Sequence, residues 1–393
     1  MPEISILYDQ SESDEHGIRM TANELGIDLG YIPFYKTAFS FNQETYNIRT
    51  PGKDYTSDLN DSRVVINRCQ SKSRRIHASI IIESIGKYAL NPLTVEQNCQ
   101  SKLKTLLGFS KAGIKIPRTV YASPNVKENI TSGGFQDNTE SLRLLLMQEL
   151  GKHNIVVKPD AGTHGRGVSL AENQDKLITI LKATEKGITN PSGVLAQELV
   201  EKWFYDLRII VKKEGNSPVC YQNALARGGF KEFRTNTFLG NMVFRARLPE
   251  SVRRTAEACA EVLAEGADYY VLALDAMPSI PKDLMDSEEE VRQSFKDLEA
   301  PFSRVNQVKK MPNKRINFNE YTAAINDAYL NYMDVDAYRH IEKTVNKTLD
   351  LTAENVVFHE GNACPEFWEQ TRIVGGINLA IPILKCSQTI IDT

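Results

Sequence analysis

The sequence lacks the patterns that mark several common classes of protein. Its six cysteines are scattered and form no Cys-x-x-Cys pair, so neither a zinc site nor a disulfide framework is indicated. The formal net charge is −3, which provides no bulk basic field to attract nucleic acid. No apolar run approaches the roughly 20 residues that a membrane-spanning helix needs. We therefore expect neither a nucleic-acid partner nor a membrane partner.

The first residues also lack the basic and apolar regions of a secretory signal peptide, because they begin a strand instead. Together with the unpaired cysteines, this favours a cytoplasmic location. The chain has 393 residues, of which 41% are hydrophobic and 25% charged. These values are typical of a globular protein with two or three lobes.

In the N-terminal part, strands alternate with helices. Residues 4–8, 31–34 and 64–67 are predicted strands, and residues 14–25 and 78–86 are predicted helices. This alternation predicts a parallel α/β sheet, which we assign to an N-terminal domain of residues 1–92. The second helix carries isoleucines that we expect to face inward, namely Ile80, Ile81, Ile82 and Ile85.

Residues 94–112 are predicted to form one helix that Gly113 stops. A loop is predicted at 124–138, where Asn, Ser and Gly are frequent, and a second at 227–241. We assign residues 93–200 to a small lid lobe and residues 201–393 to a C-terminal lobe.

The stretch from residue 154 to residue 170 suggests a binding site for a polyphosphate. A β-branched strand, 155–157, ends at Lys158 and is followed by a turn rich in glycine. Such a turn lets backbone N–H groups approach an anion, and a lysine on the preceding strand can reach the same anion. The motif is neither a Walker A loop nor a Rossmann fingerprint, so a plain hairpin turn with a surface lysine is the alternative.

Carboxylate and amide side chains are predicted at the ends of later strands. They are Asp275, Glu360 and Asn362. In a strand, residues 360 and 362 share one face, and their oxygens suit Mg²⁺ held together with nucleotide phosphates. The alternative for each carboxylate alone is a strand end facing water. Arginines that could hold phosphate or carboxylate oxygens are Arg208, Arg227, Arg234 and Arg372.

Residues 276–354 interrupt the strand pattern. Apolar residues recur at helical spacing from Phe318 to Tyr332 and from Val335 to Leu349, which predicts two amphipathic helices. They could pack on each other or on the main body, or they could form a surface for a dimer or a protein partner.

In series, these motifs resemble those of the ATP-grasp carboxylate–amine ligases. Within that fold group, the sequence is similar to the ribosomal-protein-S6 glutamate ligases and to the α-aminoadipate–carrier-protein ligase of lysine biosynthesis. The resemblance covers almost the whole chain apart from the insertion at about 276–354. The matching stretches are 64–69, 82–86, 98–103, 111–119, 157–167, 197–200, 206–208, 234–237, 274–275 and 360–362.

The resemblance implies an ATP-grasp fold, preceded by a parallel α/β domain and interrupted by a helical insertion. It also implies roles for particular residues. Nucleotide contacts would come from Lys102, Lys158, Gly162, Thr163, Gly165, Gly167, Glu198, Val200 and Asp206. The catalytic arginines would be Arg227 and Arg234, and the acid substrate would contact Arg208, Asn236 and Arg372. Two Mg²⁺ ions, for which Mn²⁺ is an alternative, would be held by Asp275, Glu360 and Asn362.

The implied reaction activates a carboxylate as an acyl phosphate, which an amine then attacks to give an amide, ADP and phosphate. The expected partner is a small amino acid or peptide, or an acidic carrier protein, and a homo-oligomer is expected. The competing hypothesis, motivated by the insertion, is an ATP-binding regulatory or scaffold protein without ligation. The post-metal stretch 366–375 matches only loosely, so the substrates themselves are left open.

Overall fold

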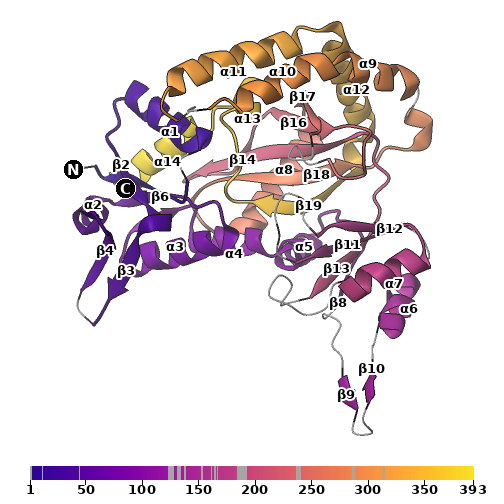
Figure 1. The fold of residues 1–393 in the computed structure, drawn as a ribbon, viewed down its shortest axis with the longest axis horizontal. Coiled ribbons are helices and arrows are strands. Elements are labelled where there is room, and N and C mark those ends of the chain that lie inside the picture. Colours follow the sequence, from indigo (N-terminus) through magenta and orange to yellow (C-terminus); the bar gives the residue numbers. More distant parts are fainter. Residues whose placement is uncertain are drawn as a thin grey trace.

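The computed structural model describes residues 2–10, 12–43, 45–122, 128–130, 134–136, 139–151, 154–160, 162, 165, 167–183, 193–235, 240–285, 288–312 and 315–393. Within these ranges the chain forms five β-sheets flanked by helices. Figure 1 shows three groups of elements: an α/β sheet that holds the N-terminus, a small sheet with two helices, and a large sheet covered by the insertion. None of the described helices has the length and hydropathy needed to cross a bilayer.

The N-terminal group is built on a parallel sheet of order β2-β1-β6-β7, as the alternation of strands and helices predicts. The central strands are buried on both faces, which explains their apolar sequences. A small antiparallel sheet, β3-β4-β5, was not predicted. The elements are β1 (Ile4–Tyr8), α1 (Ser13–Glu24), β2 (Leu29–Pro33), η1 (Phe34–Lys36), β3 (Ala38–Phe41), β4 (Tyr46–Thr50), β5 (Lys53–Asp54), α2 (Thr56–Asp61), β6 (Val64–Arg68), α3 (Lys72–Ser84) and β7 (Tyr88–Leu90).

The single helix predicted at 94–112 is wrong, because the chain forms α4 (Leu93–Gln100) and α5 (Lys102–Lys111). Ser101 separates them. Its hydroxyl accepts a hydrogen bond from the backbone N–H of Lys104 and also donates to Asp160, so it caps α5. This break places Lys102 in the first turn of a new helix, next to the glycine-rich turn.

The small sheet has the antiparallel order β12-β11-β13-β8 and packs against α6 and α7. Its strands β11 and β12 flank the glycine-rich turn, as predicted. Within the segment expected to be a loop, β9 and β10 form a short antiparallel pair. The elements are β8 (Thr119–Ala122), β9 (Glu128–Ile130), β10 (Gly134–Gln136), α6 (Thr139–Leu150), β11 (Ile155–Pro159), β12 (Ser169–Ala171), α7 (Gln174–Ala183) and β13 (Val194–Glu198).

The large sheet is antiparallel, with order β17-β16-β14-β18-β19 and β15 paired to β14. Helix α8 covers one face with buried Val252, Ala256 and Leu263. Strand β17 begins directly after the stretch predicted as a loop at 227–241, and β16 extends into the start of that stretch. The elements are β14 (Tyr205–Glu214), β15 (Val219–Cys220), β16 (Asn223–Gly228), β17 (Met242–Arg247), α8 (Glu250–Ala264), β18 (Tyr269–Pro278) and β19 (Val356–Asn362).

The insertion packs on this large sheet. The two predicted amphipathic helices are confirmed as α11 (Phe318–Met333) and α12 (Asp336–Thr352), and their apolar stripes are buried. Phe244 of β17 contacts Phe295, Tyr332 and Tyr338 through their rings. The insertion therefore shares the main core, and Figure 1 shows its helices along one side of the sheet. Its other elements are η3 (Lys282–Leu284), α9 (Glu288–Asp297), α10 (Glu299–Lys309) and η4 (Ala353–Asn355).

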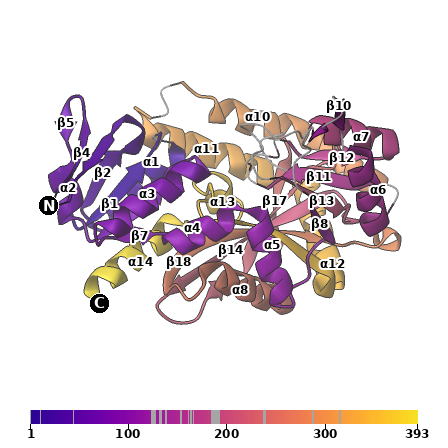
Figure 2. The same ribbon diagram turned by 90° about the horizontal axis from the view of Figure 1, so that it is seen from below.

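The C-terminal segment returns to the N-terminal sheet. After α13 (Gln370–Ile373), helix α14 (Ala380–Asp392) buries Leu384 and Cys386 in a core shared with Ile6 and Val64. Figures 1 and 2 both show the chain ends in the same region. The domain boundaries at 92 and 200 stay predictions, and this shared core shows that residues beyond 363 complete the N-terminal group.

Candidate functional site

The site is built where β18 and β19 pair. Asp275 lies opposite Glu360, and the register shifts immediately afterwards so that Ala276 pairs with Phe358. This β-bulge leaves His359 as an extra residue, and such bulges re-aim side chains next to functional sites. Asp275 and Glu360 therefore lie within their strands and not at strand ends, so that detail of the prediction is wrong for them, whereas Asn362 is the last residue of β19 as predicted. The alternation of β19 places Asn362 on the same face as Glu360.

Two lysines from different helices contact Glu360. Nζ of Lys72, on α3, lies 3.2 Å from Oε1 of Glu360, and Nζ of Lys102, on α5, lies 3.7 Å from the same oxygen. Burial alone would raise the pKa of Glu360, but the ammonium groups of Lys102 and Lys72 outweigh it and lower the pKa to about 2. Glu360 is therefore ionised at neutral pH.

A third lysine, Lys158, is buried at the end of β11. Burial lowers its pKa to about 8, and repulsion from Lys102 acts in the same direction, while Glu360 opposes both. Burial also lowers the pKa of Lys102. Two ammonium groups thus contact Glu360 and a third interacts with it through its charge, and this excess of buried positive charge suits a polyanion.

Lys102 also touches the glycine-rich turn. Its Nζ lies 3.4 Å from the carbonyl oxygen of Asp160 and 3.3 Å from that of Gly162. Gly165 and Gly167 have φ angles of 70° and 73°, a region that L-residues with side chains rarely adopt. Lys102, to which the resemblance gives a nucleotide contact, therefore lies against the glycine-rich turn.

Asp275 and Asp206 are held by arginines. Arg208 donates two hydrogen bonds of 3.0 Å to Asp275, and Arg227 donates bonds of 2.8 Å and 3.0 Å to Asp206. Nη2 of Arg227 also lies 3.2 Å from Asp275. Burial would raise the pKa of both aspartates, but the arginines outweigh it and hold both pKa values below their usual range. The result is a buried row of alternating charges, which we call the ladder; in order, its members are Asp206, Arg227, Asp275 and Arg208.

The ladder extends toward the glycine-rich turn. Thr235 donates to Asp206 and accepts a 2.8 Å hydrogen bond from Nζ of Lys202. Next to it, Arg234 donates a 3.0 Å hydrogen bond to the carbonyl oxygen of Gly165. Arg234 therefore links the large sheet to the glycine-rich turn.

Two other predicted nucleotide residues, Glu198 and Val200, lie at the end of β13 and just beyond it. The backbone N–H of Glu198 donates to the carbonyl oxygen of Arg118, and the carboxylate of Glu198 accepts from the N–H of Arg118. The carbonyl oxygen of Val200 accepts from Lys202. Thr163 and Asn236 lie outside the described residues.

Arg372 contacts a different group of residues. It donates a 2.6 Å hydrogen bond to Asn326 of α11, and its guanidinium lies 4.3 Å from the ring centroid of Trp368. Arg372 is therefore neither a solvated loop residue nor in the ladder, and these two contacts join the insertion to the post-metal stretch.

Several residues of the cluster were not predicted: Lys72, Lys202, Thr235 and His359. Burial, and then the charge of Lys158, lower the pKa of His359 to about 4. Within the described part of the chain, its Nε2 is buried without a hydrogen-bond partner. The sequence signal was available only for Lys72, which follows the strand 64–68 and Ser71 in a typical capping pattern.

The donor set fits a hard divalent cation. Asp275 and Glu360 are ionised and paired in register, and Asn362 adds an amide on the same face. Among the described residues, no three His, Cys, Asp or Glu side chains are already clustered for a metal. Cation binding would therefore exchange Arg and Lys partners for the metal.

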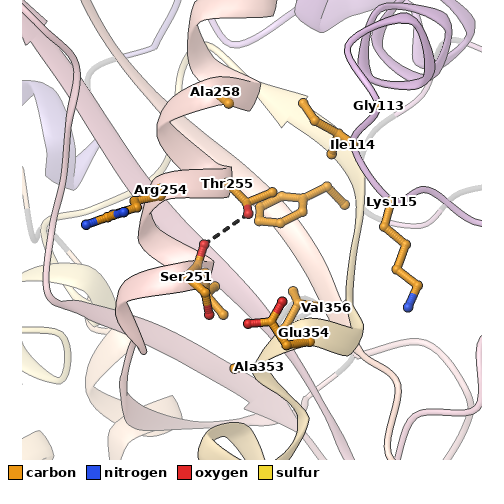
Figure 3. A pocket seen from close by; sticks show the side chains of 12 residues that line it. Gly113, Ile114, Lys115, Ser251, Arg254, Thr255, Ala258, Ala353, Glu354 and Val356 are labelled. Carbon is orange, nitrogen blue, oxygen red and sulfur yellow. Dashed lines mark hydrogen bonds between the residues drawn. The ribbon is translucent and has the colours of Figure 1, made fainter.

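A separate pocket of about 390 Å³ lies between α8, residues 113–115 and the start of β19 (Figure 3). Its wall includes Phe358, on the opposite side of the bulge from Glu360. Two cations of this wall already have partners, because Lys115 donates to Asn355 and Arg254 pairs with Glu250. The described lining of the pocket carries two cations and the carboxylate of Glu354, and both cations have partners, unlike the three buried lysines of the cluster around Glu360.

The sequence is similar to those of known proteins. Residues 100–279 match the RimK-like ATP-grasp domain. The alpha-aminoadipate–LysW ligase LysX of Sulfurisphaera tokodaii is 28% identical over 254 residues, which cover 64% of this chain and 78% of that protein. A probable alpha-L-glutamate ligase of Legionella pneumophila is 28% identical over 184 residues, or 46% of this chain and 53% of that protein.

Solved structures share the fold over the whole chain. The D-cycloserine synthetase DcsG has a TM-score of 0.57 at 12% identity, covering 98% of this chain and 99% of that one. The macrocyclase MdnC of Microcystis aeruginosa, bound with its precursor peptide MdnA, has a TM-score of 0.55 at 13% identity, covering 100% of both chains. The predicted ATP-grasp fold is thereby confirmed.

Proposed function

Because the chain carries a RimK-like ATP-grasp domain, we infer that it is an ATP-dependent ligase that joins a carboxylate to an amine. The observation that carries this inference is the group of three lysines around Glu360, next to the ladder of Asp275, Arg208 and Arg227. Buried cations facing ionised carboxylates suit phosphoryl transfer, in which the protein mainly positions and neutralises charge.

We propose that the nucleotide lies between β13 and Glu360. Backbone groups at Glu198 and Val200 would contact adenine, and Lys102, Lys158 and the glycine-rich turn would contact the phosphates. Asp275, Glu360 and Asn362 would hold two Mg²⁺ ions, or Mn²⁺, which would neutralise the transferring phosphoryl group. Arg227 is held in place by Asp206 and would face the same group.

The proposed first step moves the terminal phosphoryl group of ATP onto a carboxylate oxygen. The bond between the terminal phosphorus and ADP breaks, and its electron pair stays on the ADP oxygen. A new P–O bond forms between the phosphorus and the carboxylate of the acid. The amine then attacks the acyl carbon, phosphate leaves with the electron pair, and the nitrogen loses a proton. Arg208 and Arg234 would orient the acid, because a guanidinium matches the two oxygens of a carboxylate.

For the substrates, we propose an amino acid as the amine and a peptide or acidic carrier protein as the acid. The support is that relatives are named for α-aminoadipate with LysW and for L-glutamate, and that a structural neighbour is bound with a precursor peptide. A homo-oligomer is part of the proposal, as is a cytoplasmic location, which the six free cysteines support.

The test is ADP release from Mg-ATP with pairs of acids and amines, followed by mass spectrometry of the products. Glutamate, α-aminoadipate, short acidic peptides and an acidic carrier protein form the panel. ADP release that requires both an acid and an amine, with an amide mass, is the expected result. Nucleotide binding without any amide across the panel would support the scaffold hypothesis, which the ligase names of the relatives disfavour.

A further inference from the structure

Lys72 is positioned by the N-terminal sheet and not by the ATP-grasp domain. It is the first residue of α3, directly after Ser71, whose hydroxyl accepts the N–H of Arg74 and caps the helix. Helix α3 follows β6, so Lys72 stands at the carboxyl edge of a parallel sheet. That edge is where open α/β sheets bind ligands.

The ammonium group of Lys72 crosses to the ATP-grasp body. It lies 3.2 Å from Glu360 and donates a 3.2 Å hydrogen bond to the carbonyl oxygen of Cys99. The side chain is only 11% exposed. A long, flexible cation is therefore held in one position at a carboxylate that we assign to metal binding.

Attachment of the N-terminal group does not depend on this contact. Asn91 donates to the carbonyl oxygens of Val271 and Ala363 at 2.7 Å and 2.6 Å, and Asp14 accepts the N–H groups of Phe367 and Trp368. These buried bonds already join the parallel sheet to β18 and to the segment after β19. The Lys72 cation is thus not needed to attach the N-terminal group to the rest of the protein.

The other two lysines are tied to the nucleotide side. Lys102 contacts the glycine-rich turn, and Lys158 lies on the strand that enters it. Lys72 reaches Glu360 from the helix that follows a strand of a different sheet, and among the described residues its ammonium group contacts Glu360 and the carbonyl oxygen of Cys99. If the carboxylate of Glu360 turns toward a metal ion, Lys72 still donates to the carbonyl oxygen of Cys99. Its other N–H groups can then donate to a phosphoryl oxygen.

We propose that Lys72 is a catalytic residue whose ammonium group contacts the phosphoryl group as it passes from ATP to the substrate carboxylate. This proposal rests on the proposed function, and it adds to the phosphoryl site a cation from outside the ATP-grasp domain. The ammonium group neutralises the phosphoryl oxygens and transfers no proton, so the bonds made and broken are those of the phosphoryl step alone.

The test measures binding of inorganic phosphate to the enzyme saturated with Mg-ADP, by equilibrium dialysis with radiolabelled phosphate. Lys72→Met should weaken phosphate binding by about tenfold or more, because one charged contact is lost, while the affinity for Mg-ADP changes by less than about twofold. Lys72→Arg should retain phosphate binding within about threefold. The matched control is Lys104→Met, at an exposed position on α5, and should behave as wild type.

Lys72→Gln provides a second variant if Lys72→Met does not fold, since its amide can still donate to the carbonyl of Cys99. Unchanged phosphate affinity in a folded Met or Gln variant would overturn the proposal, as would an equal loss of Mg-ADP and phosphate affinity. Wild-type enzyme that binds Mg-ADP but no phosphate would also overturn it. None of these outcomes affects ADP and amide formation by the wild type, which tests the proposed function separately.

Discussion

Asp275 and Glu360 lie directly opposite each other on β18 and β19, yet each is ionised by a different set of cations. Asp275 is paired with Arg208 and Arg227, whereas Glu360 is paired with Lys72 and Lys102. Two neighbouring carboxylates would ordinarily raise each other's pKa. Because each has its own cations, the pair stays doubly charged and ready to act as metal ligands.

Nucleotide affinity should depend on pH through Lys158. Burial lowers the pKa of this lysine to about 8, so the free enzyme loses the charge as pH rises through 8. The affinity for Mg-ADP should then fall by up to about tenfold per pH unit above 8, since the phosphates favour the charged lysine. Calorimetry from pH 7 to pH 9.5 checks this. Lys158→Arg, which stays charged, should flatten the profile, and a wild-type profile that is itself flat would contradict the assignment.

Glu360→Gln should lower turnover strongly while the fold remains. The loss of one anionic metal ligand is expected to cost about 3 kcal/mol of transition-state stabilisation, or a rate decrease of roughly a hundredfold or more. Its measurement is the ligase assay beside a circular dichroism melt. Near-normal turnover would mean that the metal is held elsewhere. Glu354→Gln, at an exposed position before β19, is the matched control.

Asp206→Asn should destabilise the fold. Asp206 and Arg227 are buried and share two hydrogen bonds, so removing one charge leaves the other without a full partner. The expected loss is about 3–5 kcal/mol of the free energy of unfolding, measured by urea denaturation. Asp175→Asn, on the surface helix α7, should change stability by less than about 0.5 kcal/mol. A loss of similar size in both variants would argue against the ladder.

Gly17→Ala should destabilise the junction between α1 and the post-metal stretch. A Cβ at Gly17 would lie 2.0 Å from Cε3 of Trp368, so the ring or the helix must shift. We expect a loss of about 1–3 kcal/mol in the free energy of unfolding. Asn23→Ala, at an exposed position of the same helix, should be neutral or stabilising. An unchanged Gly17→Ala melt would show that Trp368 moves freely.

Arg372→Met tests whether this arginine binds the acid substrate or only stabilises the fold. Its contacts with Asn326 and Trp368 predict a loss of about 1–2 kcal/mol of stability, with no change in the affinity for Mg-ADP. Thermal melts and calorimetry separate the two effects. A raised KM for the acid at unchanged stability would restore the substrate assignment.

Much of the fold could be predicted because its signals are local. The alternation of apolar strands and helices predicts the parallel N-terminal sheet, and the apolar stripes of α11 and α12 predict two buried helix faces. Prediction failed where a run of similar residues hides which side of a helix faces the core. The prediction that Ile80, Ile81 and Ile82 all face inward is one example. Ile80 is 43% exposed because consecutive residues of one helix cannot all face the core.

The site was predicted only in part, because its partners come from distant segments. Lys158, Glu360 and Asp275 stand beside glycines or within apolar strands and could be recognised from sequence. For Lys72 only the start of a helix could be recognised, and not its contact with Glu360, which joins residues 288 positions apart. The bulge at His359 also has no sequence signal, and it decides which side chains share a face.

The core shared by β1, β6 and α14 has a consequence for synthesis on the ribosome. Domains generally fold as they emerge, N-terminal first. Here Ile6 and Val64 are covered by Leu384 and Cys386, from the last helix of the chain. The sheet, complete at Leu90, must therefore wait with an apolar face open until the chain has been extended by 294 residues to Leu384. Nascent chains stalled before residue 380 should bind chaperones through that face.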